Sequence, residues 1–583
     1  MYQILNRISS PNDVKKLSLE ELEILAKDVR EALMNRLSKI GGHFAPNFGV
    51  VEATIALHYV FSSPVDKIVF DVSHQSYTHK ILTGRKNGYI NDEDFALDSG
   101  YTNPEESIHD IFNIGHTSTS ISLASGLVKA RDLKGDKENI IAFIGDGSLS
   151  GGEALEGLDF VGGEISSNMI IVVNDNEMSI AENHGGLYKS LKALRESNGE
   201  STNNIFKTFG LDYIYEPNGN DIKSLIDVFK KVKDIDHPIV VHIHTIKGQG
   251  YEPAISNKEG WHWTIPFNVE TGERPVFDNE TYITIVRDYS LKKAKEDKDF
   301  FIICPAIPSS VGFRPNYRKE MGKQFVDVGI CEEHALSMAS GAAKRGSKPC
   351  VFSSATFLQR TYDQMSQCVC INSSPVTVVS FNSSMMALKD VTHSGIFSLS
   401  TFNDIPNLVI LAPTSKEEVE TMLDWSINQT THPVLILLPS GPVRHNVPLV
   451  NYDEINTYQM TRKGEKIAIL ALGDFYSRGE DLVEALIKEG YNPTLINPRF
   501  ASGLDKKMLD DLINNHELVI TLEDGVKDNG FGEKIASYYG PKDIKVLNYG
   551  LEKKFIDRYD IEELLESLEM TTPQIVKKIK EIL

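Results

Sequence analysis

Short apolar runs rich in valine and isoleucine alternate along the chain with longer segments in which apolar residues recur at helical spacing. The runs have the length of buried strands, and none reaches the roughly 18 apolar residues that suggest a membrane span. Strands that alternate with helices usually form parallel sheets covered by helices. The pattern therefore predicts an α/β fold with mainly parallel sheets.

The predicted strands form three groups separated by polar intervals rich in turn-forming residues. A chain of 583 residues is also too long for one hydrophobic core. We therefore expect three domains, 1–278, 279–449 and 450–583, with boundaries near Asn279 and Val450. The predicted strands are 67–74, 139–146, 168–175 and 238–245 in the first group; 300–307, 325–330, 349–356, 375–382, 407–413 and 433–439 in the second; and 466–474, 493–498, 518–524 and 545–550 in the third.

Two segments of the first domain carry local signals. Ser18 and Glu21 have the spacing of a capping box, and the helical periodicity that follows ends at Ile40, before a double glycine. His43 follows that double glycine, so we expect loop geometry to position it. The Ser, Asn and Gly content of residues 183–205 favours a loop.

Charge and cysteine content narrow the class of protein. The formal net charge of -21 would repel a nucleic-acid backbone, so we expect no nucleic-acid partner. The start of the chain has no apolar segment, which favours a cytoplasmic location without a membrane partner. Five cysteines without metal-type spacing predict buried free thiols rather than disulfides.

A glycine-rich stretch, GDGSLSGGEALEGL, follows the apolar run IIAF and raises the question of phosphate binding. It contains no lysine, which excludes a Walker loop. Gly145 and Gly147 are followed by glycines at 151 and 152, so the spacing of the dinucleotide-binding fingerprint also fails.

An acidic residue and an amide follow two successive predicted strands of the first domain. Asp146 ends the run IIAFIGD, and Asn176 follows the run MIIVVND. Oxygen ligands from neighbouring strand ends, beside a glycine-rich turn with free N–H groups, suit a Mg²⁺ ion that bridges a diphosphate. The stretch therefore predicts a site for a metal-bound diphosphate.

Several blocks extend this interpretation to the whole chain: GGHFAPNFGVVEATIALHYVF, DVSHQSYTHKILTGR, GHTSTSIS, NDNEMSI, TIKGQGYEPA, EEHA and TFLQRTYDQ. In this order they resemble the 1-deoxy-D-xylulose-5-phosphate synthase family of the transketolase superfamily; the third domain matches more loosely, through LALGD, INPRFASGLD and LEDGVKDNGFG. The resemblance implies a transketolase-like thiamine-diphosphate-binding fold and a homodimer. Its three domains would be a diphosphate- and Mg²⁺-binding domain, a pyrimidine-binding domain and a transketolase C-terminal-like domain.

The resemblance also implies roles for individual residues. Glu332 would activate the cofactor, because a carboxyl group hydrogen-bonded to the aminopyrimidine ring favours the tautomer that removes the thiazolium C2 proton. The structural alternative is that Glu332 only interacts with backbone amides at a helix start, and that His58 and His109 are packing groups. The implied Mg²⁺ ligands are Asp146, Asn176 and the backbone carbonyl of Met178, and the implied cofactor-binding residues are His74, Gly115, His116, Thr117, Gly147, Ser148, Asn176, Lys247, Phe357 and Glu332.

The implied substrates are pyruvate and an aldehyde acceptor, glyceraldehyde 3-phosphate, which give 1-deoxyxylulose 5-phosphate and CO2. His262 lies in WHWTIPF, where the family has a His-Gly pair. The implied catalytic residues are Glu332, His43, His393, His262 and Arg360, and His74 is a further polar residue that the family's chemistry uses.

The chain departs from the family at positions that handle the acceptor. Asn382 and Ser440 occupy positions of family arginines, and Ser354 that of a tyrosine. Lys389 aligns with a family aspartate, although Asp390 could serve after a shift of one residue. Since guanidinium groups bind phosphate best, these changes predict weaker phosphate recognition unless Lys389 or Arg444 compensates.

Three hypotheses therefore remain open at this point. The chain is a deoxyxylulose-phosphate synthase with a rebuilt phosphate pocket, or a thiamine-diphosphate-dependent acyl or ketol transferase with another acceptor, one without phosphate included. The third is a binding or regulatory relative without catalysis. The third hypothesis leaves one observation unexplained: a protein without catalysis would not need the full set of Asp146, Asn176, Glu332 and His393, which this chain contains.

Overall fold

The computed structural model describes residues 2–277, 279–446, 448 and 451–583. The chain divides into two compact units. The first comprises Met1–Asp278 with Gly329–Cys331, and the second comprises Asn279–Val328 with Glu332–Leu583. Val450, the second predicted boundary, and residue 449 lie outside the described residues, and the three domain ranges stay predictions.

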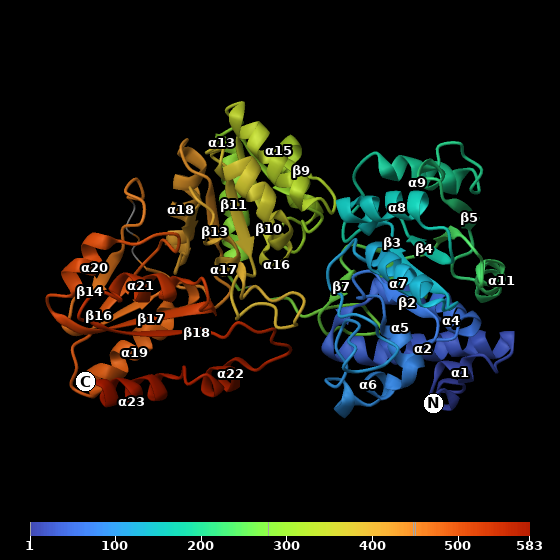
Figure 1. The fold of residues 1–583 in the computed structure, drawn as a ribbon, viewed down its shortest axis with the longest axis horizontal. Helices are drawn as coiled ribbons and strands as arrows, with labels where there is room; N and C mark the ends of the chain where they lie inside the picture. Colours follow the sequence, from blue (N-terminus) through green and yellow to red (C-terminus); the bar gives the residue numbers. More distant parts are fainter. Residues whose placement is uncertain (1, 278, 447, 449–450) are drawn as a thin grey trace. The chain divides into compact units, whose positions relative to one another are not determined.

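The first unit is built on a parallel sheet of five strands (Figure 1). Every neighbouring pair in this sheet is parallel, so all carboxyl ends of its strands lie at one edge. The spatial order is β2 (Lys67–Phe70), β3 (Ile140–Gly145), β4 (Met169–Asp175), β6 (Pro238–His244) and β5 (Asp212–Glu216).

Helices cover both faces of this sheet. Successive strand residues point to opposite faces, so Ile141 and Phe143 join one core cluster while Ala142 and Ile144 join the other. The first face packs on α2 (Leu19–Ile40), α4 (Val51–Val60) and α11 (Ile222–Val232), and the second on α7 (Ser120–Lys134), α8 (Gly152–Glu164) and α9 (Leu187–Glu196). Shorter helices are α1 (Pro11–Val14), α3 (Ala45–Gly49), α5 (Tyr77–Lys80), α6 (Asn87–Ile90), α10 (Ile205–Thr208) and α12 (Glu252–Ser256).

The predicted first helix is confirmed as α2. The backbone N–H of Glu21 donates to Ser18 Oγ at 3.2 Å, and the N–H of Ser18 donates to the Glu21 carboxylate at 3.0 Å. Gly41 ends the helix at φ 78°, a conformation that favours glycine. His43 then lies in a two-residue strand, β1 (Gly42–His43), which pairs with β7 (Trp263–Thr264).

The predicted loop at residues 183–205 is partly wrong, because α9 occupies its middle. Leu191 and Leu194 of α9 are buried in the core of the first unit, and this packing outweighs the polar composition of the segment.

The second unit contains two sheets (Figure 1). The first is entirely parallel, whereas β14 pairs antiparallel at one edge of the second. The strands of the first, in spatial order, are β12 (Val409–Leu411), β13 (Val434–Leu437), β11 (Thr377–Phe381), β10 (Lys348–Ser354), β8 (Phe300–Cys304) and β9 (Phe325–Asp327). Those of the second are β14 (Gln459–Arg462), β16 (Thr494–Asn497), β15 (Lys466–Ala471), β17 (His516–Val526) and β18 (Lys545–Leu551).

One core cluster joins the two sheets of the second unit. Val378 and Leu435 of the first sheet belong to the same cluster as Leu470 and Val519 of the second. A further cluster packs the other face of the second sheet on α19 (Tyr476–Lys488) and α23 (Thr572–Ile582). The helices are α13 (Tyr282–Glu296), α14 (Pro315–Met321), α15 (Glu332–Lys344), α16 (Ala355–Leu358), α17 (Ser398–Phe402), α18 (Lys416–Asn428), α19 (Tyr476–Lys488), α20 (Lys506–Leu512), α21 (Phe531–Tyr539), α22 (Ile561–Ser567) and α23 (Thr572–Ile582).

Every predicted strand range overlaps a strand, and the predicted α/β fold with mainly parallel sheets is confirmed. In the three larger sheets the pattern missed β5 and β14, whose residues are largely half-buried or exposed and include charged side chains. Both are edge strands, which do not need a continuous apolar run.

The structure also tests the prediction of buried cysteine thiols and allows a search for membrane-spanning helices. None of the five cysteines forms a disulfide, as predicted, and Cys304, Cys350 and Cys370 are buried as predicted. Cys331 and Cys368 are only partly buried; Cys331 lies in the turn before α15, and Cys368 lies in a short π-helical segment that packs against α15. Across the part of the chain that the structure describes, no helix has the length and apolar character that crossing a membrane requires.

Candidate functional site

Most of the predicted first-domain site residues follow the carboxyl ends of strands in the first unit. β2 leads into His74, β3 into Asp146, β4 into Asn176 and β6 into Lys247. Because these strands are parallel neighbours, the four residues are delivered to one edge of the sheet, where ligands of α/β proteins usually bind.

Asp146 and Asn176 are in contact at this edge. The backbone N–H of Asn176 lies 3.5 Å from Asp146 Oδ1, and burial together with the nearby Asp175 raises the pKa of the Asp146 carboxyl. Asn176 Oδ1 is buried and has no hydrogen-bond partner among the described residues. A carboxylate and an unsatisfied amide oxygen are donors that fit a hard cation such as Mg²⁺.

Met178 follows two residues later, in a bridge with Glu182 that turns the chain back. Its backbone carbonyl is the third ligand that the sequence implies. The described residues hold no cluster of three or more His, Cys, Asp or Glu side chains that could bind a metal. The implied ligand set has only one carboxylate, so it is not a cluster of that kind.

The glycine-rich turn is packed closely by its neighbours. A Cβ atom at Gly147 would lie 3.0 Å from the Cα of Ser179, so the turn leaves little room for a side chain. Ser118 Oγ donates to the carbonyl of Ser148 at 2.8 Å, which ties the turn to the loop containing Gly115, His116 and Thr117. The residues that the sequence predicts around the diphosphate therefore lie in two backbone segments joined by this hydrogen bond, called the backbone cradle below.

Lys247 completes this group with a positive charge. Its Nζ donates to the carbonyl of Ser179 at 2.6 Å, and the side chain is buried. Burial lowers the pKa of Lys247 to about 7, so an incoming anion would stabilise its charged form.

Asp71 holds the loop after Thr117 in place through hydrogen bonds, a role that the sequence did not suggest. Its two carboxylate oxygens accept from the backbone N–H groups of Ser118 and Ser120, at 2.9 and 3.0 Å. Val72 and Ser73, directly before His74, have φ angles of 58° and 61°. A β-branched residue in this region is strained, and such strain clusters at functional sites.

Three predicted histidines lie together in the first unit. The ring centroids of His43 and His74 are 5.0 Å apart, those of His74 and His262 are 5.3 Å apart, and those of His43 and His262 are 5.7 Å apart. Burial, with the charges of Lys247 and the other two histidines, holds the pKa of His262 well below its usual range. The His262 ring is therefore neutral near pH 7.

Asn47 positions two of these histidines. Its Nδ2 donates to the backbone carbonyls of His43 and His74, both at 2.8 Å, and its Oδ1 accepts from the N–H of Tyr77. Asn47 belongs to the block GGHFAPNFG, in which only His43 was predicted to take part in function. The signal available in the sequence was an asparagine within a glycine-rich block.

His58 and His109 lie in a separate network, as the packing interpretation predicted. His58 Nε2 contacts His79 Nδ1 at 2.9 Å, and His79 Nε2 contacts Asp110 at 2.9 Å. His109 contacts the hydroxyl of Ser63 at 2.9 Å. The network holds the segment around Asp110 against α4 and α5.

The second unit holds Glu332 at the start of α15. The side chain is buried, and Arg360 Nη1 lies 4.0 Å from Oε2. Burial raises the pKa of Glu332 to about 7, although Arg360 and the residue's own backbone N–H oppose the shift. Within the described residues Glu332 Oε2 has no hydrogen-bond partner, so backbone amides do not satisfy this carboxyl fully. An acid buried in this way fits a proton-transferring role.

His393 lies beside Phe357 in the second unit, with ring centroids 5.7 Å apart. Asp390 Oδ1 is 3.0 Å from His393 Nδ1 and accepts from the backbone N–H of His393 at 3.1 Å. Although burial opposes it, the His393 ring with its charge and the hydrogen bonds from Thr392 lower the pKa of Asp390 to about 2. Asp390 rather than Lys389 therefore contacts the histidine, and Lys389 Nζ lies 5.9 Å from the Tyr559 ring centroid.

The positions at which the chain departs from the family lie near the carboxyl ends of β10, β11 and β13. Asn382 Nδ2 lies 3.4 Å from Ser354 Oγ, and the backbone N–H of Ser440 donates to Asp474 Oδ2 at 2.7 Å. Arg444 forms an ion pair with Glu480. Its guanidinium is thus engaged by a carboxylate of the same unit.

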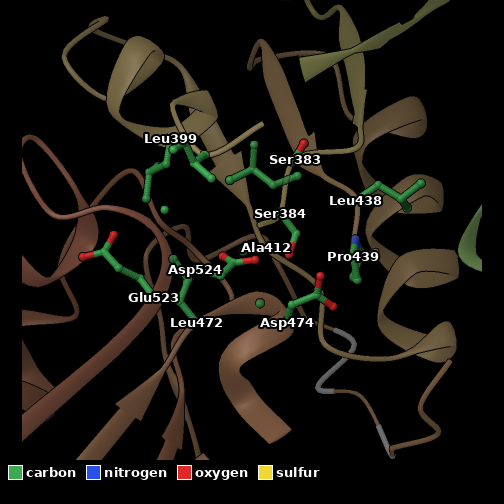
Figure 2. Close-up of a pocket in the computed structure, with 14 residues that line it drawn as sticks. Ser383, Ser384, Leu399, Ala412, Leu438, Pro439, Leu472, Asp474, Glu523 and Asp524 are labelled. Atoms are coloured by element: carbon green, nitrogen blue, oxygen red, sulfur yellow. The ribbon is translucent and has the colours of Figure 1, made fainter. Parts of the chain in front are cut away.

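A pocket within the second unit lies beside these positions, and Figure 2 shows Asp474 and Asp524 on its wall close to Ser384. Burial raises the pKa of Asp474, and burial with the charge of Asp474 raises that of Asp524 to about 7. Burial also raises the pKa of Glu523, another residue of the lining, to about 8. The residues that line this pocket next to Ser440 include no basic side chain that could bind a phosphate group.

Comparisons with known proteins match the whole chain. The family model described as 1-deoxy-D-xylulose-5-phosphate synthase matches residues 5–203 and 198–245. Models of the transketolase pyrimidine-binding domain and C-terminal domain match residues 281–445 and 457–575.

Curated relatives extend over the same length. The 1-deoxy-D-xylulose-5-phosphate synthases of Caldanaerobacter subterraneus subsp. tengcongensis and Listeria monocytogenes are 36% and 37% identical to this chain, covering 99% and 100% of it and 98% of each relative. The Carboxydothermus hydrogenoformans synthase is 37% identical over 100% of both chains. The chain belongs to the 1-deoxy-D-xylulose-5-phosphate synthase family. It is therefore a thiamine-diphosphate-dependent transferase with the predicted transketolase-like fold.

Among solved structures the chain is similar to transketolases. The Campylobacter jejuni transketolase is 16% identical with a TM-score of 0.45, covering 97% of this chain and 100% of that one. A Pichia stipitis transketolase is 15% identical with a TM-score of 0.45, covering 97% of both chains.

Because the pKa of Glu332 is raised, we expect the free energy of unfolding of the cofactor-free protein to depend on pH. The folded state binds the proton with a pKa of about 7 against 4.5 in the unfolded chain, so stability is lost as pH rises between these values. We expect Glu332→Gln to remove this loss. The variant should unfold with a free energy about 1 kcal/mol above wild type at pH 5 and about 3 kcal/mol above it at pH 8, measured by chemical denaturation.

The matched control is Glu333→Gln, at the next and less buried helix position. It should change the free energy of unfolding little at either pH. A Glu332→Gln protein no more stable than wild type at pH 8 would contradict the uncompensated burial of this carboxyl.

Proposed function

We propose that this chain catalyses the reaction for which its relatives are named, the formation of 1-deoxy-D-xylulose 5-phosphate and CO2 from pyruvate and glyceraldehyde 3-phosphate. The observation that carries the proposal is the match to these synthases at 36–37% identity over 99–100% of the chain. The residues at the carboxyl edge of the first unit's sheet support it independently.

Asp146, Asn176 and the carbonyl of Met178 would hold Mg²⁺ in this proposal. The backbone cradle of residues 115–117 with Gly147 and Ser148 would hold the diphosphate, together with His74 and Lys247. Lys247 supports the role because its buried ammonium has a lowered pKa that an anion would restore. Phe357 and Glu332 would contact the pyrimidine ring. When bound, thiamine diphosphate supplies the carbon on which pyruvate is decarboxylated.

Glu332 would hold and transfer the proton that activates the cofactor. With a pKa near 7, its carboxyl is populated in both protonation states at neutral pH, as a group that gives and takes a proton requires. His43 and His262 would orient substrate oxygens, and the neutral His262 ring suits a hydrogen bond rather than a charge. Arg360 and His393, the latter held by Asp390, would also bind the substrate.

The homodimer and the cytoplasmic location stay predictions. The remaining alternative, a binding or regulatory role without catalysis, would leave the buried Glu332 carboxyl and the Asn176 amide oxygen without purpose.

The proposed activity is tested by incubating the protein with thiamine diphosphate, Mg²⁺ and pyruvate, with and without glyceraldehyde 3-phosphate. We expect CO2 release and deoxyxylulose 5-phosphate, followed by mass spectrometry. Glu332→Gln should lower turnover by at least about 100-fold, because general acid–base catalysis is typically worth 10²–10⁴.

Glu333→Gln serves as the control and should retain turnover. The assignment fails if Glu332→Gln turns over at the wild-type rate. Cofactor binding without turnover of any donor would favour the regulatory alternative.

A second candidate is transfer to an acceptor without phosphate. The observation behind it is the polar but uncharged pair Asn382 and Ser354, together with Ser440, whose backbone N–H donates to Asp474. Arg444, which could have compensated, is paired with Glu480. The lining of the pocket in Figure 2 has no basic side chain that would bind a phosphate group.

Acceptor preference separates the two candidates. Two charged hydrogen bonds of about 1.5–3 kcal/mol each would favour glyceraldehyde 3-phosphate over glyceraldehyde by more than about 100-fold in kcat/KM. We expect a smaller ratio in wild type and about a tenfold larger ratio in Asn382→Arg, with Asn382→Gln as the uncharged control. A wild-type ratio above about 1,000 would show that other groups bind the phosphate.

A further inference from the structure

We propose that Asn183 is a positioning residue for the cation, which holds the Asp146 carboxylate in the orientation of a metal ligand. The inference rests on the proposed function for its cation and diphosphate. It assigns a role in the first unit to a residue outside the implied ligand set.

The contact between Asn183 and Asp146 is direct. Asn183 Nδ2 donates to Asp146 Oδ2 at 2.6 Å. The bridge between Met178 and Glu182 folds the chain back after β4, and this turn brings position 183 to the end of β3. The two residues are 37 positions apart in sequence, so the contact is a product of this turn.

The two carboxylate oxygens of Asp146 contact different groups. Oδ2 is held by the Asn183 amide, and Oδ1 lies 3.5 Å from the backbone N–H of Asn176. A carboxylate held at both oxygens cannot rotate freely, so its remaining lone pairs keep a fixed direction. The amide oxygens of Asn176 and Asn183 are both buried, with no hydrogen-bond partner in the described ranges.

The charge of the surroundings explains why a neutral amide suits position 183. Asp146 is buried near a second carboxylate, Asp175, which His242 and Arg195 contact at 3.0 and 2.5 Å. An amide adds a donor without adding a third negative charge. Tyr188, five residues further on, donates its hydroxyl to the carbonyl of Gly147 at 3.2 Å and fastens the same segment to the glycine-rich turn.

The test measures the Mg²⁺ concentration that the protein needs in order to bind thiamine diphosphate. In Asn183→Ala we expect the Mg²⁺ concentration for half-maximal binding to rise about 10- to 100-fold, the usual loss when a group that supports a metal ligand is removed. Calorimetric titration with thiamine diphosphate at a series of Mg²⁺ concentrations gives this value. Excess Mg²⁺ should restore cofactor affinity, and the metal-free variant should remain folded at the temperature of the titration.

Two further variants separate positioning from other roles. Asn203→Ala changes an exposed asparagine of the same segment and should leave the Mg²⁺ requirement at the wild-type value. Asn183→Asp keeps the size and an oxygen but removes the N–H donor, so we expect it to stay as weak as Asn183→Ala.

Four results would overturn the inference. These are an unchanged Mg²⁺ requirement in Asn183→Ala, wild-type behaviour of Asn183→Asp, a loss that excess Mg²⁺ does not reverse, and a lowered unfolding midpoint that accounts for the loss. If wild type binds thiamine diphosphate without Mg²⁺, or not at all, the cofactor part of the proposed function fails and takes this inference with it.

Discussion

The parallel pairing of β2, β3, β4 and β6 is the constraint on which the first unit's site depends. Parallel strands end at the same edge, so each strand can deliver one residue to a common place without any contact in sequence. His74, Asp146, Asn176 and Lys247 come from four separate strand ends. The loops that leave this edge then only have to orient the residues, which Asp71, Asn47 and Asn183 do through hydrogen bonds.

Burial is the second physical theme of the site. It raises the pKa of Asp146 and Glu332 and lowers that of Lys247, so these groups lie in environments that disfavour their charges. Folding carries this cost because the hydrophobic clusters on both faces of the sheets supply a large stabilisation. A charged ligand would relieve the cost, which makes the site more stable when filled.

Much of the fold could be predicted from the sequence, because buried parallel strands are nearly continuous apolar runs that stand out from their surroundings. The edge strands β5 and β14 were missed because they are polar and lack such a run. Around α9 the composition suggested a loop, but the packing of Leu191 and Leu194 outweighs it. Motif residues such as Asp146 and Glu332 carry chemistry in their type and spacing. Asn47, Asp71 and Asn183 act through contacts across long sequence separations, which no local pattern reveals. The partner of His393, Asp390 rather than Lys389, likewise needed the structure.

In the proposed function, the carboxyl edge of the first unit's sheet binds thiamine diphosphate through a divalent cation held by Asp146. Calorimetric titration of the cofactor into wild type and Asp146→Ala, each with Mg²⁺ and with a chelator, tests it most directly. The account predicts tight binding only for wild type with Mg²⁺, because the variant loses the charged ligand of the ion. Equal binding in all four titrations would contradict it.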